Sequence, residues 1–149
     1  MIRLATVEDL NNIEKLLNNV TIDLIEKGIE QWHYPWSLSW SDGLYVLEID
    51  EVIIGTFSIS SLNDHIVFPL GNKGDLYLHT IAIYPRYQEN KLGLNIIRYV
   101  KNIAESSNVD IYLDCWNGSN NLKKFYSSAG LNEYGIFLED DYEICIFKF

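Results

Sequence analysis

Residues 78–94 read LHTIAIYPRYQENKLGL, and this stretch decides the fold. It begins inside the most β-rich run of the chain, Leu76–Ile83, which Tyr84-Pro85 ends. Apolar residues then recur at helical spacing from Gly93 to Ser106. A strand that turns sharply into a helix points several backbone N–H groups at one place, beside the positive end of the helix dipole. The stretch therefore predicts a turn that can bind a diphosphate. Every strand–turn–helix unit shares this geometry, so the turn alone does not identify a function.

The rest of the chain alternates strand and helix patterns around this unit. The expected elements are strands at Ile2–Leu4, Leu44–Ile49, Val52–Ser60, Asp110–Trp116, Asn132–Leu138 and Tyr142–Phe149, and helices at 7–19 and Asn120–Ala129. Residues Thr21–Lys27 continue the first helix, either directly or after a break. Thr6 and Ser119 are the expected N-caps, and Gly28 and Gly130 the expected helix ends. Residues 31–40 and 63–74 predict loops, and Asp50-Glu51 a hairpin turn. This order predicts a single α/β domain over residues 1–149, built on one mixed sheet of six to seven strands with about four helices.

Composition excludes several classes of protein. Hydrophobic residues make up 48% of the chain and charged residues 21%, as in ordinary globular domains. The net charge of −10 argues against nucleic acid as a partner, and no apolar run is long enough for a membrane span. Cys115 and Cys145 are the only cysteines; neither they nor the three histidines have metal-ligand spacing, so no metal is expected. We expect a cytoplasmic protein.

Two segments resemble a known family. The GNAT superfamily of N-acetyltransferases has a strand ending in Ala-Val-x-Pro, followed by Gln/Arg-x-x-Gly-x-Gly/Ala at the start of a helix. Ile81-Ala82-Ile83-Tyr84-Pro85 and Gln88-Glu89-Asn90-Lys91-Leu92-Gly93 stand in those places. Phe125-Tyr126-Ser127-Ser128-Ala129-Gly130-Leu131 is similar to the family's closing Phe/Leu-Tyr-x-x-x-Gly-Phe. The element order is also similar from Ile2 to Phe149, so the resemblance covers the whole chain.

The resemblance implies a mostly antiparallel sheet whose two central parallel strands, Leu76–Ile83 and Asp110–Trp116, splay apart around acetyl-CoA as co-substrate. The residues that it assigns to the cofactor are Ile81, Ala82, Ile83, Gln88, Glu89, Asn90, Lys91, Leu92, Gly93, Leu94, Ser119 and Asn120. Lys91 replaces the first glycine of the family pattern, and Ser119 replaces a common asparagine. The ammonium group of Lys91 could bind the phosphates, or its side chain could narrow the site.

The resemblance also implies catalytic roles. Tyr126 stands where the family places a tyrosine that protonates the departing thiolate; the alternative is that it packs under the sheet. Strand alternation places Tyr77, His79, Ile81 and Ile83 on one face. Histidine titrates near neutral pH, so His79 is the candidate base for the amine, with a structural role as the alternative.

The acceptor is expected to be a small-molecule amine. In the family the acceptor pocket is formed by the loop after the first helices and by the last hairpin, here Gln31–Trp40 and Glu139–Asp141. Trp32, Tyr34, Trp36 and Tyr77 are the predicted acceptor-binding residues, unless the aromatic residues of the loop fill a gap in the core. Residues 86–124 carry a charge of +2 and the remainder −12, which favours a cationic acceptor.

Two functions remain open from the sequence. The first is an acetyl-CoA-dependent N-acetyltransferase, and the second is a non-catalytic module of the same fold that binds coenzyme A or an amine. The residue at position 91 keeps the second hypothesis open. The sequence leaves the oligomeric state undecided, with a homodimer among the options.

Overall fold

The computed structural model describes residues 1–29, 31–62 and 74–149. Its seven strands form one mixed sheet in the order β1-β2-β3-β4-β5-β7-β6. They are β1 (Ile2–Leu4), β2 (Leu44–Ile49), β3 (Val52–Ser61), β4 (Leu76–Ile83), β5 (Ile111–Trp116), β6 (Asn132–Glu139) and β7 (Tyr142–Lys148). The helices of the described residues are α1 (Leu10–Glu26), α2 (Leu92–Ser107) and α3 (Asn120–Ser128), with 3₁₀ segments η1 (Val7–Asp9) and η3 (Pro85–Asn90). The predicted α/β class and mixed sheet are confirmed, with element bounds within a few residues of those expected.

The helix count is the main difference from prediction. The sequence left open a break near Thr21, and α1 is one continuous helix of 17 residues. The Thr21 hydroxyl donates a hydrogen bond of 2.6 Å to the Leu17 carbonyl within the helix, so this β-branched residue fits without interrupting it. The helix ends where predicted, because Gly28 has φ +80°, a conformation that costs glycine little. The predicted loop at 63–74 lies outside the described residues except for Gly74.

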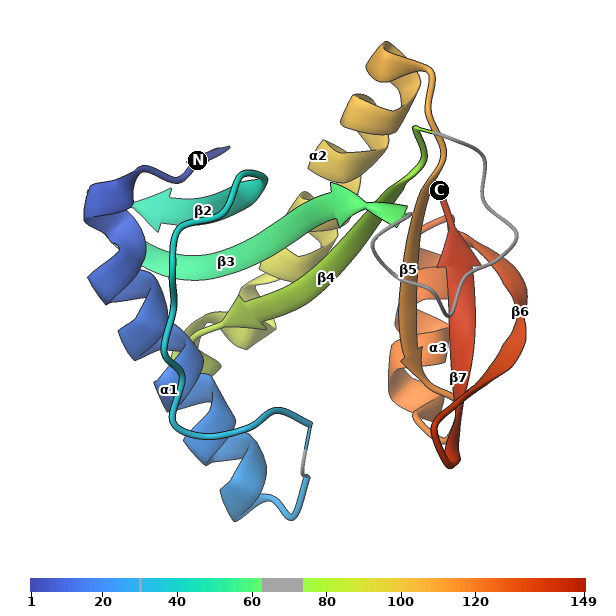
Figure 1. Cartoon of the computed structure of the whole chain (residues 1–149), viewed down its shortest axis with the longest axis horizontal. Helices are drawn as coiled ribbons and strands as arrows, with labels where there is room; N and C mark the ends of the chain where they lie inside the picture. Colours follow the sequence, from blue (N-terminus) through green and yellow to red (C-terminus); the bar gives the residue numbers. More distant parts are fainter. Residues whose placement is uncertain (30, 63–73) are drawn as a thin grey trace. The chain divides into compact units, whose positions relative to one another are not determined.

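The backbone forms two compact units, Met1–Ser58 with Thr80–Ile96, and Ile59–His79 with Ile97–Phe149. In the first unit, α1 packs its apolar face on β2 and β3 (Figure 1). The buried contacts of this core come from residues at helical spacing and from strand residues, namely Ile13, Leu16, Leu17, Val20, Leu44, Val46 and Ile53. The predicted hairpin joins β2 to β3 through Asp50 (φ 49°) and Glu51 (φ 66°), the two positive values that a tight two-residue turn requires.

The second unit is built around β5. It pairs in parallel with β4 at Leu76↔Ile111 and Tyr77↔Tyr112, and it pairs antiparallel with β7 along its whole length. Figure 1 shows α3 behind β5 and β7. The opposite face of these strands carries a small apolar cluster, Leu62, Tyr112, Ile144 and Ile146, with Tyr77 and Phe137 against it. Strand β6 lies at the edge of the sheet, and its Ile136 and Leu138 are 49% and 69% exposed.

Among the described residues, no helix has the length and apolar character that a membrane crossing requires.

Candidate functional site

The turn between β4 and α2 belongs to the first unit and has an unusual backbone. Lys91, between η3 and α2, has φ 58° and ψ 23°, in the left-handed region. A residue with a Cβ adopts this conformation at a cost of about 1 kcal/mol, whereas glycine adopts it freely. The left-handed backbone therefore explains why the family pattern has a glycine at this position, independently of any ligand. This chain keeps the conformation with a lysine.

The same turn holds most of the residues predicted to bind the cofactor. Gln88 donates its side-chain N–H to the Ile83 carbonyl at 2.9 Å, so its amide closes the turn. Opposite this segment a Cβ on Gly55 would lie 3.2 Å from the Ala82 carbonyl oxygen, so glycine allows β3 to approach closely. Glu89 is exposed, and the side chain of Asn90 lies outside the described atoms. Leu92, Gly93 and Leu94 form the first turn of α2, where backbone N–H groups have no acceptor within their helix.

In the second unit, the most informative contact joins two strands. The Tyr77 hydroxyl on β4 donates a hydrogen bond of 2.8 Å to Asp114 Oδ2 on β5. Both side chains are partly buried. Burial raises the pKa of Asp114 from 3.8 to about 6; the Tyr77 hydrogen bond opposes this rise and the charge of Glu139 adds to it. Burial, together with the Asp114 charge, also raises the pKa of Tyr77. Asp114 is thus a carboxylate that takes and releases a proton near neutral pH.

Asp114 was not among the residues predicted for the site. A signal was present, since an acid in the middle of an apolar strand pattern (Ile111-Tyr112-Leu113-Asp114-Cys115) is unusual in a buried element. Its partner could not be inferred, because the bond joins residues 37 positions apart.

Tyr126 is 7% exposed and lies on α3. Its ring contacts Phe147 at 5.4 Å between centroids and Phe125 at 5.5 Å. Burial raises its pKa, and the charges of Cys115 and Asp114 raise it further. Within the described residues its hydroxyl makes no hydrogen bond, and no buried side-chain oxygen there lacks a partner, so this oxygen reaches the surface. A neutral phenol is the form that can donate a proton.

Asp114 and Tyr126 lie on opposite sides of β5. Phe147 pairs with Leu113, so the ring of Tyr126 lies on the face of Leu113 and Cys115. Strand alternation puts Asp114 on the other face, with Tyr77 and Ile146. The parallel pairing of β4 with β5 in the described residues is confined to Leu76↔Ile111 and Tyr77↔Tyr112, near the start of both strands.

His79, the predicted base, lies beside the Tyr77–Asp114 pair. Its ring stacks on Tyr77 with centroids 5.2 Å apart and planes at 18°, which agrees with the predicted common face of these two residues. Thr80 follows with φ 53°, and Ala82 and Ile83 are both buried in succession. The strand is irregular at Thr80, so alternation cannot be extended from His79 to Ile81 and Ile83.

The predicted acceptor loop is attached to α1 in the first unit. The rings of Trp32 and Trp36 meet edge to face at 5.6 Å and pack on the core. The indole N–H of Trp36 donates to Thr21 Oγ1 at 2.8 Å, and its backbone N–H donates to Asn18 Oδ1 at 2.7 Å. These contacts favour the alternative that Trp32 and Trp36 fill the core. Tyr34 is 50% exposed, and its acceptor role stays a prediction.

The start of α3 differs from expectation in one detail. Ser119 is the N-cap residue, as predicted, but its hydroxyl makes no capping hydrogen bond. Its carbonyl instead accepts from the Lys123 N–H at 3.1 Å, and the Lys123 ammonium donates to Asn117 Oδ1 at 2.9 Å. The side chain of Ser119 is therefore not used by the helix, and Asn120 beside it is exposed.

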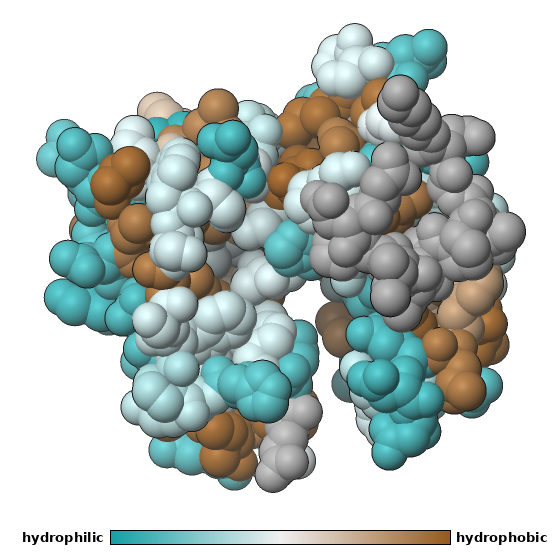
Figure 2. Space-filling view, in the orientation of Figure 1, coloured by the Kyte–Doolittle hydropathy of each residue, from teal (hydrophilic) through white to brown (hydrophobic). Residues whose placement is uncertain are grey.

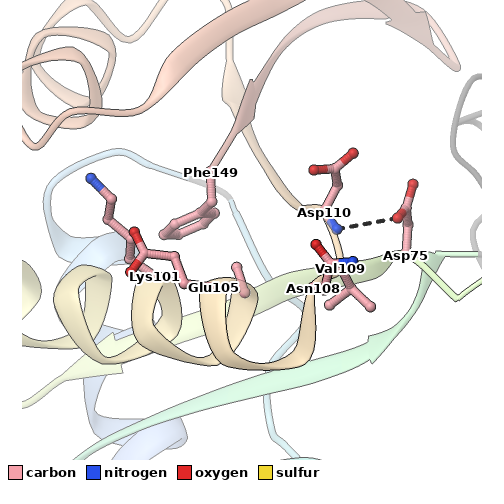
Figure 3. Close-up of a pocket in the computed structure, with 8 residues that line it drawn as sticks. Asp75, Lys101, Glu105, Asn108, Val109, Asp110 and Phe149 are labelled. Carbon is pink, nitrogen blue, oxygen red and sulfur yellow. Dashed lines mark hydrogen bonds between the residues drawn. The ribbon is translucent and has the colours of Figure 1, made fainter.

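A separate hollow of about 520 Å³ lies beside the C-terminal end of α2 (Figure 3). Its lining includes Asp75, Lys101, Glu105, Asp110 and Phe149, and none of the predicted site residues. Two of its three carboxylates have partners: Asp75 accepts from the Asp110 N–H at 3.2 Å, and Asp110 pairs with Lys148 at 3.1 Å. The described part of the chain holds no group of His, Cys, Asp and Glu side chains arranged to bind a metal.

Comparison with known proteins agrees with this geometry. The model of the Acetyltransferase (GNAT) family matches residues 9–131. No curated protein matches the sequence. Among solved structures, a GNAT-family acetyltransferase of Listeria monocytogenes has a TM-score of 0.78 at 19% identity, covering 100% of this chain and 94% of that one. The ribosomal-protein-S18-alanine N-acetyltransferase of Escherichia coli has a TM-score of 0.71 at 16% identity, covering 99% and 91%. An N-acetyltransferase of Staphylococcus aureus has a TM-score of 0.67 at 18% identity, covering 100% of both.

At these identities the structural likeness supports the fold, and the family match over residues 9–131 supports membership. The chain therefore belongs to the GNAT family of acetyltransferases.

Proposed function

We propose that this protein is an acetyl-CoA-dependent N-acetyltransferase that acts on the amine of a small cationic acceptor. The observation that carries the proposal is the Asp114 carboxyl, which accepts a hydrogen bond from Tyr77 and has a pKa of about 6. Asp114 lies on β5, and its charge also raises the pKa of Tyr126. The family supplies the reaction class, and these residues supply groups that can remove and deliver protons.

Asp114 is the base in this proposal. An alkyl ammonium group must lose a proton before its nitrogen can attack a thioester. At pH 7 to 8 a carboxyl group with a pKa of about 6 is mostly ionised and can accept that proton. The hydrogen bond from Tyr77 fixes one carboxylate oxygen and leaves the other to accept. His79, stacked on Tyr77, remains the alternative base, and variants of both residues separate the two.

Tyr126 is the acid. Its pKa is raised by burial, so it stays protonated over the working range, and its hydroxyl is not engaged by the described residues. In the proposal it donates its proton to the coenzyme thiolate as that group leaves. The Tyr126 phenolate is then reprotonated by the second proton that the attacking nitrogen loses on becoming an amide, and the charge of Asp114 favours this return to the neutral phenol.

The first turn of α2 suits the phosphates of coenzyme A. Leu92, Gly93 and Leu94 offer backbone N–H groups at the positive end of a 16-residue helix. Arg86 and Lys91, on the same turn, add positive charge. These residues would hold the diphosphate, and bound acetyl-CoA would supply the activated acetyl group. No metal is needed for these steps, and a cytoplasmic location is part of the proposal.

Titration with acetyl-CoA followed by an amine panel tests the function. We expect acetyl-CoA to raise the melting temperature of the full chain, and coenzyme A to be released faster with diamines and aminoalkyl compounds than with amino acids. High salt should reduce that preference. Cofactor binding without release for any amine would favour a non-catalytic module. Absence of both a melting shift and calorimetric heat at saturating acetyl-CoA would exclude the cofactor.

A further inference from the structure

The end of β4 is fixed against β3 within the first unit. The Tyr84 N–H donates to the Ile54 carbonyl at 2.9 Å, and a Cβ on Gly55 would lie 3.2 Å from the Ala82 carbonyl oxygen. Residues 82 and 84 therefore turn their backbone groups toward β3. Because these groups alternate along a strand, the backbone groups of Ile83 lie on the edge of β4 that β3 does not pair.

Gln88 occupies the Ile83 carbonyl on that edge. Its side-chain N–H donates to this oxygen at 2.9 Å, and the bonded groups are partly buried although Gln88 as a whole is exposed. The Tyr87 N–H closes the same segment by donating to the Tyr84 carbonyl at 2.8 Å. Gln88 belongs to η3, which leads through the left-handed Lys91 into α2. One side chain thus joins the end of β4 to the segment that begins α2.

The two parts that Gln88 joins would contact different ends of the cofactor. Residues 81–83, which the resemblance assigns to the cofactor, would contact the pantetheine arm, and the first turn of α2 would hold the diphosphate. The arm and the nucleotide are covalently joined. They reinforce each other in binding only where the strand end and the helix start have the spacing that the cofactor requires.

Charge contributes little to holding this cofactor. The chain has a net charge of −10, which repels a polyanion at long range. Acidic groups are concentrated at the turn between β6 and β7, which carries Glu139, Asp140 and Asp141, and Figure 2 shows hydrophilic side chains gathered there. Affinity for coenzyme A must then come from short-range contacts that are in place before binding, and a fixed turn between β4 and α2 supplies them.

We propose that Gln88 is a positioning residue for coenzyme A. Through the Ile83 carbonyl it sets the spacing between the strand end that contacts the pantetheine arm and the helix start that holds the diphosphate. This inference rests on the cofactor part of the proposed function. It requires that Gln88 strengthens binding of the whole cofactor and leaves binding of its separate halves unchanged.

The test compares acetyl-CoA with its two halves, S-acetylpantetheine and 3′-phosphoadenosine 5′-diphosphate. Calorimetry gives the dissociation constant of acetyl-CoA, and NMR chemical-shift titration gives those of the weaker halves. The product of the two half constants divided by the acetyl-CoA constant is the effective concentration, which measures how well the two binding parts are spaced. Gln88→Met removes the N–H donor and keeps the side-chain length. It should lower the effective concentration about 2- to 10-fold, the range of one neutral hydrogen bond.

Two further variants separate positioning from a general loss of structure. Gln88→Arg restores an N–H donor, and it should restore the effective concentration even if its charge tightens binding of the nucleotide half. The matched control is Asn95→Met, the same exchange of an amide for a thioether at an exposed position of α2, which should leave the effective concentration unchanged. An unchanged effective concentration in Gln88→Met, an equal fall in Asn95→Met, or no recovery in Gln88→Arg would each overturn the proposal.

These measurements use binding alone, so they separate the role of Gln88 from the reaction. If acetyl-CoA binds and no amine is acetylated, the proposed catalytic function fails and the test of Gln88 still decides its role. If amines are acetylated and Gln88→Met keeps the effective concentration, only the positioning role is wrong. If the unchanged protein binds no acetyl-CoA, both proposals are wrong.

Discussion

The Tyr77 hydroxyl donates a 2.8 Å hydrogen bond to Asp114 Oδ2, across the two parallel strands at the centre of the sheet. This bond lowers the pKa of Asp114 against the effect of burial. Tyr77→Phe removes only the hydroxyl, so the pKa of Asp114 should rise above about 6. The acidic limb of the kcat/KM profile should then move to higher pH. Tyr142→Phe, which alters a phenol not bonded to Asp114, is the control, and an unmoved limb in Tyr77→Phe would remove Asp114 from the profile.

Asp114→Asn should reduce turnover by about 10²- to 10⁴-fold at pH 8, as expected for loss of a general base. If His79→Gln has the larger effect on turnover and on the pH profile, the base is His79.

The same Asp114→Asn variant should be more stable than the unchanged protein. The folded-state pKa of about 6 lies above the ordinary 3.8, so ionisation of Asp114 opposes folding. The stability associated with the protonated form is fully present below pH 3.8 and is lost as the pH rises through about 6. At pH 8 the free energy of unfolding should therefore increase by about 2–3 kcal/mol in the variant, and near pH 3.5 it should not change. Urea unfolding at the two pH values measures this; equal differences at both would contradict the raised pKa.

Tyr126→Phe tests the proposed acid. The ring contacts with Phe125 and Phe147 are kept and the hydroxyl is lost, so folding should be preserved. We expect turnover to fall about 10- to 1000-fold while the dissociation constant of acetyl-CoA stays the same. Stopped-flow release of coenzyme A and calorimetry give the two quantities. Unchanged turnover would make Tyr126 a packing residue only.

Lys91 offers a test in which conformation and charge can be separated. Lys91→Gly should stabilise the fold by about 0.5–1 kcal/mol, because φ 58° suits glycine, whereas Lys91→Ala removes the charge and keeps the Cβ and should not stabilise. For acetyl-CoA, weaker binding in both variants means that the ammonium group contacts the phosphates. Tighter binding in Lys91→Gly alone means that the side chain or its backbone obstructs them. Equal stability of the glycine and alanine variants would argue against the left-handed conformation.

Local patterns predicted most of the fold. The predicted elements lie within a few residues of those in the structure. The signals used were strand alternation, helical spacing and the glycines at 28 and 130, and each of these signals arises from residues close together in the sequence. The sequence left open whether the helix breaks near Thr21, and it does not, because the threonine hydroxyl bonds inside the helix. The unused hydroxyl of Ser119 could not be foreseen, because the same residue type caps helices in many other contexts.

The site was less predictable for a physical reason. Lys91 could be singled out from the motif, but its left-handed backbone is visible only in three dimensions. Asp114 gains its raised pKa from burial and from Glu139, which lies 25 residues further along the chain on another strand. Trp32 and Trp36 have the composition of a ligand pocket, yet their hydrogen bonds and ring contacts attach them to α1. Composition cannot distinguish an aromatic side chain that packs in the core from one that lines a ligand-binding pocket.

The edge strand β6 has a consequence for handling the protein. An edge strand presents unpaired backbone groups that another chain can extend, and the exposed Ile136 and Leu138 would add an apolar seam to such a join. At neutral pH the molecule carries a net charge of −10, and Glu133 and Glu139 flank the seam, so two molecules repel each other. Near the isoelectric point of 4.6 that repulsion disappears, and self-association through β6 becomes the route to precipitation.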